Sequence, residues 1–351
     1  QYMPILVLRG VVAVSGGGVK RRNMARILFE HMYDEIISPE NLLESWVEFV
    51  KGKRSRLDVQ EFERNLMENI LALHDRLRDM NYQHDVYHAF TVSDPKTRSI
   101  HKASVTDRLL HRAIYRKLYP FFDRTFIADS FSCRLNKGTH KALERFEYFA
   151  RRESSNHRQT VWVLKCDIKK FFASIDHDRL LKVLDERIID KRIVILLREI
   201  VQSFHAGLSG VGLPLGNLTS QLFANVYMDG FDQFVKHRLH VKHYIRYADD
   251  FVFLSKDRGY LESLLPLVEE FLGRELGLLL HPKKVEIRTV ASGLDFLGWV
   301  HFPDHRVLRT STRRRMLRSI KVDPRPEVLA SYRGLLKHGN AYKLNAHLTS
   351  T

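Results

Sequence analysis

Cysteine is scarce in this 351-residue chain, and long apolar runs are absent. The two cysteines, Cys133 and Cys166, match no zinc-ligand spacing and cannot form a disulfide framework, which favours a reducing cytosol. No stretch approaches the roughly 20 apolar residues that a membrane-spanning helix needs. These shortages exclude a disulfide-stabilised secreted protein and an integral membrane protein, and they favour a cytoplasmic one.

Acidic residues are also few relative to basic ones. Lysine and arginine total 57 against 41 aspartates and glutamates, which gives a net charge of +16 and a pI near 9.8. This excess favours a polyanionic partner, with nucleic acid first and an anionic membrane surface second. With 44% hydrophobic and 11% aromatic residues, the chain is globular and long enough for two or three subdomains.

Residues 1–23 differ from the rest of the chain. A short apolar run is interrupted by Arg9 and followed by a glycine-rich patch. Arg9 breaks the apolar core that a signal peptide requires. We therefore expect a leader, a flexible arm or a non-native extension here, with the folded body beginning near Met24.

The stretch His243–Ser255, HYIRYADDFVFLS, places two adjacent aspartates between aromatic and β-branched residues. This pattern predicts two strands joined by a turn that carries Asp249 and Asp250. Adjacent carboxylates repel each other, so we expect a cation between them, and a hard divalent ion such as Mg²⁺ prefers carboxylate oxygens. Taken alone, such a pair is more often an ordinary Asp-rich hairpin turn.

A third carboxylate follows an earlier apolar strand. The segment VWVLK, residues 161–165, runs through Cys166 into Asp167, so the strand would hold this carboxylate rigidly at its end. Phe172, five residues later, would line a pocket beside it; the alternative is that Asp167 only caps the next turn. Carboxylates converging from rigid elements are what two-metal phosphoryl transfer requires. One ion activates the attacking hydroxyl and the other neutralises the leaving pyrophosphate.

The remaining pattern places helices and short strands around these elements. Apolar residues at helical spacing predict amphipathic helices over 58–80, 103–118, 179–204, 217–239 and 261–277. Alternating segments predict a hairpin over 82–100, with its turn at Ser93–Lys96, and strands over 278–287 and 294–301.

Basic residues gather at two places. Three of them surround Gly138 before a predicted helix start, which suits a phosphate group, although a solvated basic loop is the commoner explanation. From Arg306 to the end, eleven lysines and arginines stand against two acidic residues, and helices are predicted from residue 313 and over 332–344. Such a basic helical segment beside a catalytic body favours contact with a phosphate backbone over a plain solvated face.

Together these segments resemble the reverse transcriptases, motif by motif and in order. DRLLHRAIYRKLYPFFD and SFSCRLNKGTHKAL resemble the two fingers motifs, DIKKFFASIDH and YADD the two catalytic motifs, and HPKKVEI and LDFLGWV the two that follow. The resemblance implies an α+β right-hand polymerase fold with fingers, a palm of antiparallel sheet plus helices, and a small helical thumb. The implied parts are N-terminal helices and fingers over 24–160, the palm with an interleaved fingers segment over 161–302, and a basic thumb over 303–351.

The resemblance also implies roles for individual residues. Asp167 and Asp249, with the backbone carbonyl of Ile168, would bind two Mg²⁺ ions, or Mn²⁺ in their place, and Asp250 would be the acid beside them. Lys284 would protonate the pyrophosphate, unless it is a solvated turn residue. The implied nucleotide-binding set is Phe172, Leu215, Gly216, Gln221, Arg108 and Arg134, and the implied nucleic-acid-binding set is Arg313, Arg314, Arg315 and Lys337.

The resemblance gives Phe172 and Arg108 more specific roles. Phe172 matches the steric gate, whose ring under the sugar rejects a 2′-hydroxyl and so selects deoxynucleotides. Arg108 matches a basic fingers position near the triphosphate and template, but it has the alternative of pairing with a nearby acid.

The motif LPLGNLTSQ departs from the common form. Most reverse transcriptases have Gln-Gly and end this motif in Ser-Pro, whereas this chain has Leu215-Gly216 and Ser220-Gln221. That form, with FLGWVHFPDHRVLRT, resembles the reverse transcriptases of diversity-generating retroelements. A leucine at position 215 offers only shape to the incoming nucleotide, and apolar shape discriminates weakly compared with hydrogen bonds.

The narrower resemblance implies a prokaryotic or phage-encoded enzyme that copies a template RNA with errors at adenines. The mutated cDNA would rewrite a variable region of a target gene. A separate small, basic, oligomeric accessory protein would bind both the enzyme and the RNA. Beyond the thumb we expect no maturase, endonuclease or RNase H domain. The alternatives are a reverse transcriptase of another prokaryotic class (retron, group II intron-like or defence-associated) and a non-catalytic nucleic-acid-binding relic of a polymerase.

Overall fold

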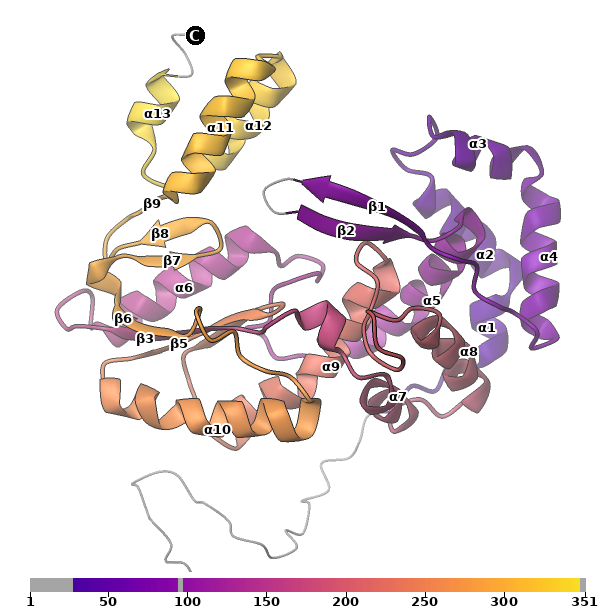
Figure 1. Cartoon of the computed structure of the whole chain (residues 1–351), viewed down its shortest axis with the longest axis horizontal. Coiled ribbons are helices and arrows are strands. Elements are labelled where there is room, and N and C mark those ends of the chain that lie inside the picture. Colours follow the sequence, from indigo (N-terminus) through magenta and orange to yellow (C-terminus); the bar gives the residue numbers. More distant parts are fainter. Residues whose placement is uncertain (1–27, 94–96, 348–351) are drawn as a thin grey trace, which may run out of the picture. The chain divides into compact units, whose positions relative to one another are not determined.

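The computed structural model describes residues 28–93 and 97–347, in which helices and strands are mixed along the chain (Figure 1). The chain forms two compact units, each assembled from two stretches. Unit 1 comprises Gln1–Thr125 and Asp176–Val241, and unit 2 comprises Phe126–Ile175 and Lys242–Thr351. Residues 1–23, where we expect a leader or arm, lie outside the described residues. Within the described ranges, no helix is both long and apolar enough to cross a membrane.

Unit 1 is mainly helical and carries an exposed hairpin. Its helices are α1 (Tyr33–Ile37), α2 (Pro39–Phe49), α3 (Leu57–Arg64), α4 (Leu66–Arg78), α5 (Val105–Asp123), α7 (His177–Asp185), α8 (Lys191–Gln202) and α9 (Leu218–His237). Strands β1 (His88–Ser93) and β2 (Thr97–Lys102) pair antiparallel. Helix α5 contacts both α2 and α9, and its residues Leu109 and Ile114 are fully buried.

The helices predicted over 103–118 and 217–239 are confirmed with shifted ends, and the helical stretch predicted over 179–204 consists of α7 and α8. The single helix predicted over 58–80 is instead two helices, α3 and α4, because Asn65 leaves the helical region at φ −118° and ψ 41°. Helix α5 begins after Ser104, whose side chain accepts a hydrogen bond from the Asp107 N–H at 3.1 Å and so caps the first turn. The predicted hairpin is β1–β2, and residues 94–96 of its turn lie outside the described residues.

Unit 2 is built on an antiparallel sheet with the strand order β4-β5-β3-β6. The strands are β3 (Trp162–Asp167), β4 (Tyr244–Tyr247), β5 (Asp250–Ser255) and β6 (Glu286–Thr289). Helix α6 (Thr139–Glu153) covers one face and α10 (Arg258–Leu276) the other (Figure 1). Because successive strand residues point to opposite faces, Val163 and Val252 pack in the cluster that contains Phe146 of α6.

A smaller sheet and further helices follow β6. Their elements are β7 (Leu294–Phe296), β8 (Trp299–His301), β9 (Arg306–Leu308), α11 (Thr310–Val322), α12 (Pro326–Leu336) and α13 (Tyr342–His347). A short 3-10 turn, η2 (Val290–Ser292), lies between β6 and β7, and another, η1 (Phe171–Ser174), follows β3. Trp299 is 1% exposed and joins Met316 and Leu336 in one apolar cluster. This cluster attaches the basic C-terminal helices to the small sheet.

Two predictions for unit 2 were wrong in detail. Residues 278–285 form no strand, because their pairing with the end of β3 is limited to an isolated bridge between Ile168 and Leu280, beside which the His281 N–H donates to the Asp167 carbonyl at 2.7 Å. The single helix predicted over 332–344 is interrupted. Helix α12 begins at Pro326 and ends at Leu336, and α13 begins only at Tyr342. Between them Gly339 lies so close to Trp299 that a Cβ would overlap the indole ring.

Candidate active site

The three aspartates identified in the sequence lie at one end of the sheet in unit 2. Asp167 is the last residue of β3 and Asp250 the first of β5, and the register sets them directly opposite each other. Residues directly opposite in an antiparallel pair have side chains on the same face. Asp249 precedes Asp250 in the β4–β5 turn, and its carbonyl accepts a hydrogen bond from the Ile168 N–H at 3.0 Å. Backbone pairing thus gathers these residues at one place.

The carboxyl of Asp250 has a raised pKa. Burial raises its pKa to about 7, Lys165 acts in the opposite sense, and the charges of Asp167 and Asp249 raise it further. Its Oδ1 is buried and has no hydrogen-bond partner among the described residues. A carboxyl with these properties holds its proton near neutral pH until a cation arrives to compensate the charge.

Lys284 supplies a cation at the neighbouring carboxylate. Its Nζ donates a hydrogen bond to Asp167 Oδ1 at 2.6 Å, from a side chain that is 39% exposed. Lys284 is thus a partly solvated turn residue that is also paired with Asp167. A lysine in this position supplies both positive charge and a proton beside the aspartates.

The chemistry of the donor set fits a hard divalent cation. Asp167, Asp249 and Asp250 offer carboxylate oxygens, which Mg²⁺ prefers, and the unpartnered Oδ1 of Asp250 lacks a positive ligand. Over residues 28–93 and 97–347, no group of three or more His, Cys, Asp and Glu side chains is already drawn together around a metal position. A metal would therefore have to draw the carboxylates together and share the Asp167 carboxylate with Lys284, which is bonded to its Oδ1.

Phe172 lies in the same unit, in the turn η1 that follows β3. Its half-buried ring packs edge-on against Phe171, with 5.4 Å between the ring centroids. Lys170, with φ +49°, reverses the chain between β3 and this turn. The ring is thus held by packing a few residues beyond Asp167, and its role as a pocket wall stays a prediction.

Arg134 stabilises the loop before α6. Its Nη1 donates to the carbonyls of Ile127 at 2.7 Å and Ser130 at 2.9 Å. The guanidinium also lies over the Phe126 ring, 5.4 Å from the centroid. Sequence patterns showed a basic residue here but not these carbonyl partners.

The other expected nucleotide-binding residues belong to unit 1. Leu215 and Gly216 lie just before Asn217, the N-cap of α9, and the Leu215 carbonyl accepts a hydrogen bond from the His101 N–H at 3.3 Å. Gly216 has φ +107°, a conformation that favours glycine, and an added Cβ would lie 3.2 Å from the side chain of Ile100. Gln221, half-buried, is in the first turns of α9. The motif therefore forms a tight connection against β2.

Arg108 is ion-paired within unit 1. Its Nη2 lies 2.5 Å from Asp58 Oδ2, and Lys102 Nζ lies 2.7 Å from the same oxygen. Although burial raises the pKa of Asp58, hydrogen bonds from these two cations hold it below its usual value. The acid-pairing alternative for Arg108 is therefore confirmed, with a partner 50 residues earlier in the chain.

A cationic pocket of about 250 Å³ lies beside this pair, entirely within unit 1. Its basic lining residues are Lys53, Arg56, Lys102, Arg108 and Arg112. Burial and repulsion from neighbouring arginines lower the pKa of Lys53, which shows how densely positive charge is packed. The buried ring of His111 also lines the pocket, and neither of its nitrogens has a hydrogen-bond partner among the described residues. The pocket suits an anion with further polar groups.

Residues 92–301 match the family described as reverse transcriptase (RNA-dependent DNA polymerase). This chain belongs to the reverse transcriptase family. The matched segment contains all three aspartates, Phe172 and Lys284.

Relatives of this reverse transcriptase include intron-encoded proteins. Protein YkfC of Escherichia coli (strain K12) is 24% identical over 269 residues, which cover 66% of this chain and 68% of YkfC. The group II intron-encoded protein LtrA of Lactococcus lactis subsp. cremoris is 28% identical over 147 residues, which cover 40% of this chain but only 23% of LtrA. Among solved structures, telomerase from Candida albicans has a TM-score of 0.49 at 13% identity, covering 66% of this chain and 46% of that one.

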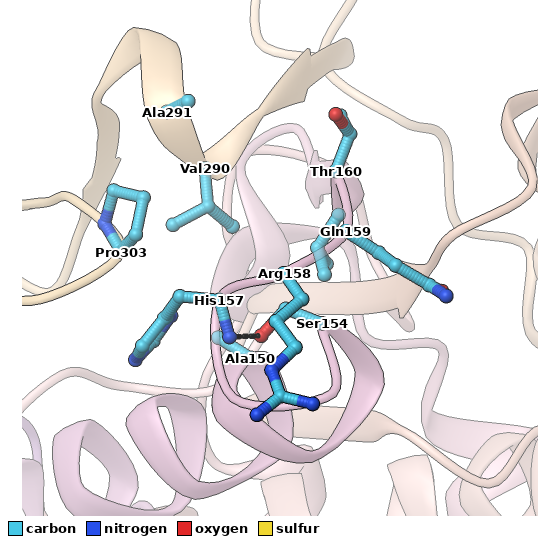
Figure 2. Close-up of a pocket in the computed structure, with 10 residues that line it drawn as sticks. Ala150, Ser154, His157, Arg158, Gln159, Thr160, Val290, Ala291 and Pro303 are labelled. Atoms are coloured by element: carbon cyan, nitrogen blue, oxygen red, sulfur yellow. Dashed lines mark hydrogen bonds between the residues drawn. The ribbon is translucent and has the colours of Figure 1, made fainter.

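A different hollow in unit 2 of the reverse transcriptase lies away from the aspartates. It has a volume of about 200 Å³, and its lining includes Val161. His157 and Arg158 also line it (Figure 2). Val161 precedes the first residue of β3 and Asp167 ends it, and a six-residue strand spans roughly 20 Å. Figure 2 shows the His157 N–H bonded to Ser154 Oγ, at 2.8 Å. The hollow is therefore separate from the candidate active site.

The basic C-terminal residues of the reverse transcriptase lie on α11 and at the end of α12. Arg313 and Arg314 are exposed on the first turns of α11, Arg315 is half-buried, and Lys337 is exposed directly after α12. Sequence reasoning missed Lys53, Arg112 and His111 of the unit 1 pocket. The basic run KGKRSR, residues 51–56, was the available signal for the first of these.

Proposed function

We propose that this reverse transcriptase carries out RNA-directed DNA polymerisation at the aspartate end of the unit 2 sheet. The observation that carries the proposal is the register that sets Asp167 opposite Asp250, with Lys284 bonded to Asp167, in a chain of this family. In this proposal the sheet of unit 2 is the palm of a right-hand polymerase, unit 1 contributes fingers, and α11–α13 form the thumb.

Asp167 and Asp249 would hold two divalent ions, Mg²⁺ or Mn²⁺, together with the Ile168 carbonyl and with Asp250 beside them. Such ions lower the pKa of the attacking 3′-hydroxyl and neutralise the leaving pyrophosphate. Lys284 holds a proton at Nζ next to Asp167 and would give it to the pyrophosphate. The Phe172 ring would lie under the sugar and exclude a 2′-hydroxyl.

Unit 1 would bind the anionic substrates. The cationic pocket around Lys53 and Arg112 suits the phosphates of the template RNA or the nucleotide, and Leu215 and Gly216 would form the surface beside the new base pair. Arg313, Arg314, Arg315 and Lys337 would grip the backbone of the product duplex. Phosphate contacts of this kind provide affinity without sequence preference.

Primer extension tests the polymerase proposal. Purified protein should extend a DNA primer on a defined RNA template with Mg²⁺ and four deoxynucleotides, and Asp249→Asn should abolish extension while RNA binding remains. Extension by Asp249→Asn at the wild-type rate would refute the assigned centre. Binding of RNA without any extension by the wild type would favour the non-catalytic alternative.

We further propose that the enzyme belongs to a diversity-generating retroelement and makes adenine-mutagenised cDNA from a template RNA. The support is the Leu215-Gly216 and Ser220-Gln221 form of the motif before and within α9. Leucine at position 215 offers no hydrogen bond with which to test the geometry of the new base pair. A separate small, basic, oligomeric accessory protein would deliver the template RNA.

Sequencing the cDNA separates this class from its competitor. Errors concentrated opposite template adenines, reduced in Leu215→Gln, would support the diversity-generating class. Evenly faithful cDNA from wild type and variant alike would contradict it. That outcome would favour a reverse transcriptase of another prokaryotic class. The similarity to the group II intron-encoded protein LtrA supports this alternative.

A further inference from the structure

An arginine is completely buried next to the aspartate turn. Arg246, on β4, is 0% exposed and lies two residues before Ala248 and three before Asp249. Burying a guanidinium is costly unless its N–H groups are hydrogen-bonded. The partners of this side chain therefore show what the buried charge accomplishes.

The guanidinium joins two segments that are far apart in sequence. Its Nη1 donates to the Ala248 carbonyl at 3.2 Å, and its Nη2 donates to Ser130 Oγ at 3.0 Å. The backbones of the same segments are also paired: the Arg246 N–H donates to the Asp129 carbonyl, and its carbonyl accepts from the Phe131 N–H, both at 3.0 Å. Ser130 therefore anchors one side of the guanidinium and the aspartate turn the other.

Ala248 needs such support because its backbone is in the left-handed region. Its φ is +56°, which an L residue adopts only at a cost in free energy. The Ala248 carbonyl that Arg246 engages belongs to the peptide that leads into Asp249. A hydrogen bond from a rigid, fully buried guanidinium fixes the plane of this peptide and with it the direction of the Asp249 side chain.

The anchor at Ser130 is itself held. Arg134 Nη1 donates to the Ser130 carbonyl at 2.9 Å, and Arg145 of α6 donates to Asp129 Oδ1 at 2.7 Å. The loop before α6 thus provides a fixed point from which Arg246 reaches the turn. All of these residues belong to unit 2.

We propose that Arg246 is a positioning residue for the polymerase reaction, which orients Asp249 through the Ala248 peptide while Ser130 fixes the guanidinium. The inference rests on the proposed role of Asp249 as a metal ligand. Carboxylate ligands tolerate little misplacement, since a site must be held within about 0.5 Å of its productive geometry. Arg246 variants should therefore be impaired first in their use of the divalent metal.

The test compares Arg246→Lys, Arg246→Met and Ser130→Ala with the matched control Arg288→Met. Arg288 lies on β6 and likewise donates from Nη1 to a turn carbonyl, that of Gly293 at 2.8 Å, but its turn carries none of the aspartates. Mn²⁺ binding to the nucleic-acid-free protein is measured by electron paramagnetic resonance. The Mg²⁺ dependence of primer extension and the melting temperature are measured in parallel.

Arg246→Met should weaken Mn²⁺ binding and raise the half-saturating Mg²⁺ concentration by about tenfold, the usual effect of losing a partner that orients a metal ligand. Arg246→Lys keeps the charge but not the two-sided geometry, so it should be intermediate. Ser130→Ala, which removes a single bond and leaves the guanidinium in place, should shift the metal dependence in the same direction if Arg246→Met does not fold. The KM for deoxynucleotides at saturating Mg²⁺ should stay within about twofold of wild type.

Two results would overturn the proposal. One is wild-type metal binding and Mg²⁺ dependence in both Arg246→Lys and Ser130→Ala. The other is loss of activity in proportion to lowered melting temperature, with the same pattern in Arg288→Met, which marks a purely structural arginine. Asp249→Asn separates this failure from that of the proposed function: if it polymerises and binds Mn²⁺ normally, the assigned centre is wrong, whatever Arg246 does.

Discussion

Because the pKa of Asp250 is raised in the folded protein, the pH dependence of the free energy of unfolding measures the environment of this carboxyl in the candidate active site. The unfolded chain releases this proton near the usual value of 3.8, whereas the folded protein holds it until about pH 7. Between these values the folded state binds more protons than the unfolded state, so stability falls as the pH rises. Asp250→Asn cannot ionise and should not show this part of the decline.

The structure sets the size of the effect. Each pH unit between 3.8 and about 7 is worth about 1.4 kcal/mol, so the wild type should lose about 4 kcal/mol that the asparagine variant keeps. Urea unfolding in the presence of EDTA, repeated from pH 4 to pH 8, measures the difference. Asp250→Asn should become the more stable protein as neutral pH is approached.

Asp58→Asn is the matched control. The pKa of Asp58 is held below its usual value, so its ion pair is fully formed throughout pH 4.5 to 8 and is lost only in more acidic solution. Asp58→Asn should therefore lower stability by an amount that does not change with pH in this window. Parallel pH profiles for wild type and Asp250→Asn, within about 1 kcal/mol, would refute the reasoning about Asp250.

Magnesium should reverse the loss. A divalent ion favours the ionised carboxyl. At a Mg²⁺ concentration 100 times the dissociation constant, the ion should therefore stabilise the wild type at pH 8 by about 2.7 kcal/mol. The asparagine variant, which lacks one negative charge at the site, should gain less. An equal gain in both proteins would show that Asp250 is not coupled to the metal.

Three further substitutions test other parts of the mechanism. Lys284→Met removes the cation that competes for Asp167, so the half-saturating Mg²⁺ concentration should fall while the maximal rate drops by about 100-fold. Steady-state kinetics measure both quantities. A raised half-saturating Mg²⁺ concentration with an unchanged maximal rate would argue against Lys284 as a proton donor. Phe172→Val should lower the preference for deoxynucleotides over ribonucleotides, the ratio of their kcat/KM values, by at least about tenfold, and an unchanged ratio would remove Phe172 as the gate. Lys53→Glu should weaken template RNA binding and reduce the salt dependence of log Kd by about one, whereas Lys141→Glu on the surface of α6 should change binding less.

Sequence patterns located the aspartates well because each follows or precedes a run of apolar strand residues. A strand such as VWVLK leaves little choice of conformation, and the residue at its end is placed with it. The sequence did not predict the register between β3 and β5, because the register depends on which residues of the two strands lie opposite each other. That register sets Asp167 opposite Asp250, where the charge of Asp167 adds to the effect of burial, which is the main reason that the pKa of Asp250 is raised.

Interaction partners that are distant in sequence were the main feature that the sequence could not predict. Arg108 and Asp58 are 50 residues apart, and Lys284 and Asp167 are 117 apart. A basic residue in a motif predicts charge but not which acid or carbonyl accepts its hydrogen bond. Only the folded chain shows that Lys284 is bonded to a candidate metal ligand and that Arg108 is bonded to an acid elsewhere in unit 1.

Arg246 shows why such residues escape a reading of local patterns. In the sequence it interrupts the apolar run before Asp249, where an arginine looks like a solvated member of a strand edge. In the structure it is fully buried, and Ser130, 116 residues earlier, and Ala248 are among the acceptors of its hydrogen bonds. A charged residue inside an apolar strand is stable only if such partners exist, so its presence was itself evidence for them. An arginine that breaks an apolar pattern next to paired carboxylates is therefore a signal to search for what it holds in place.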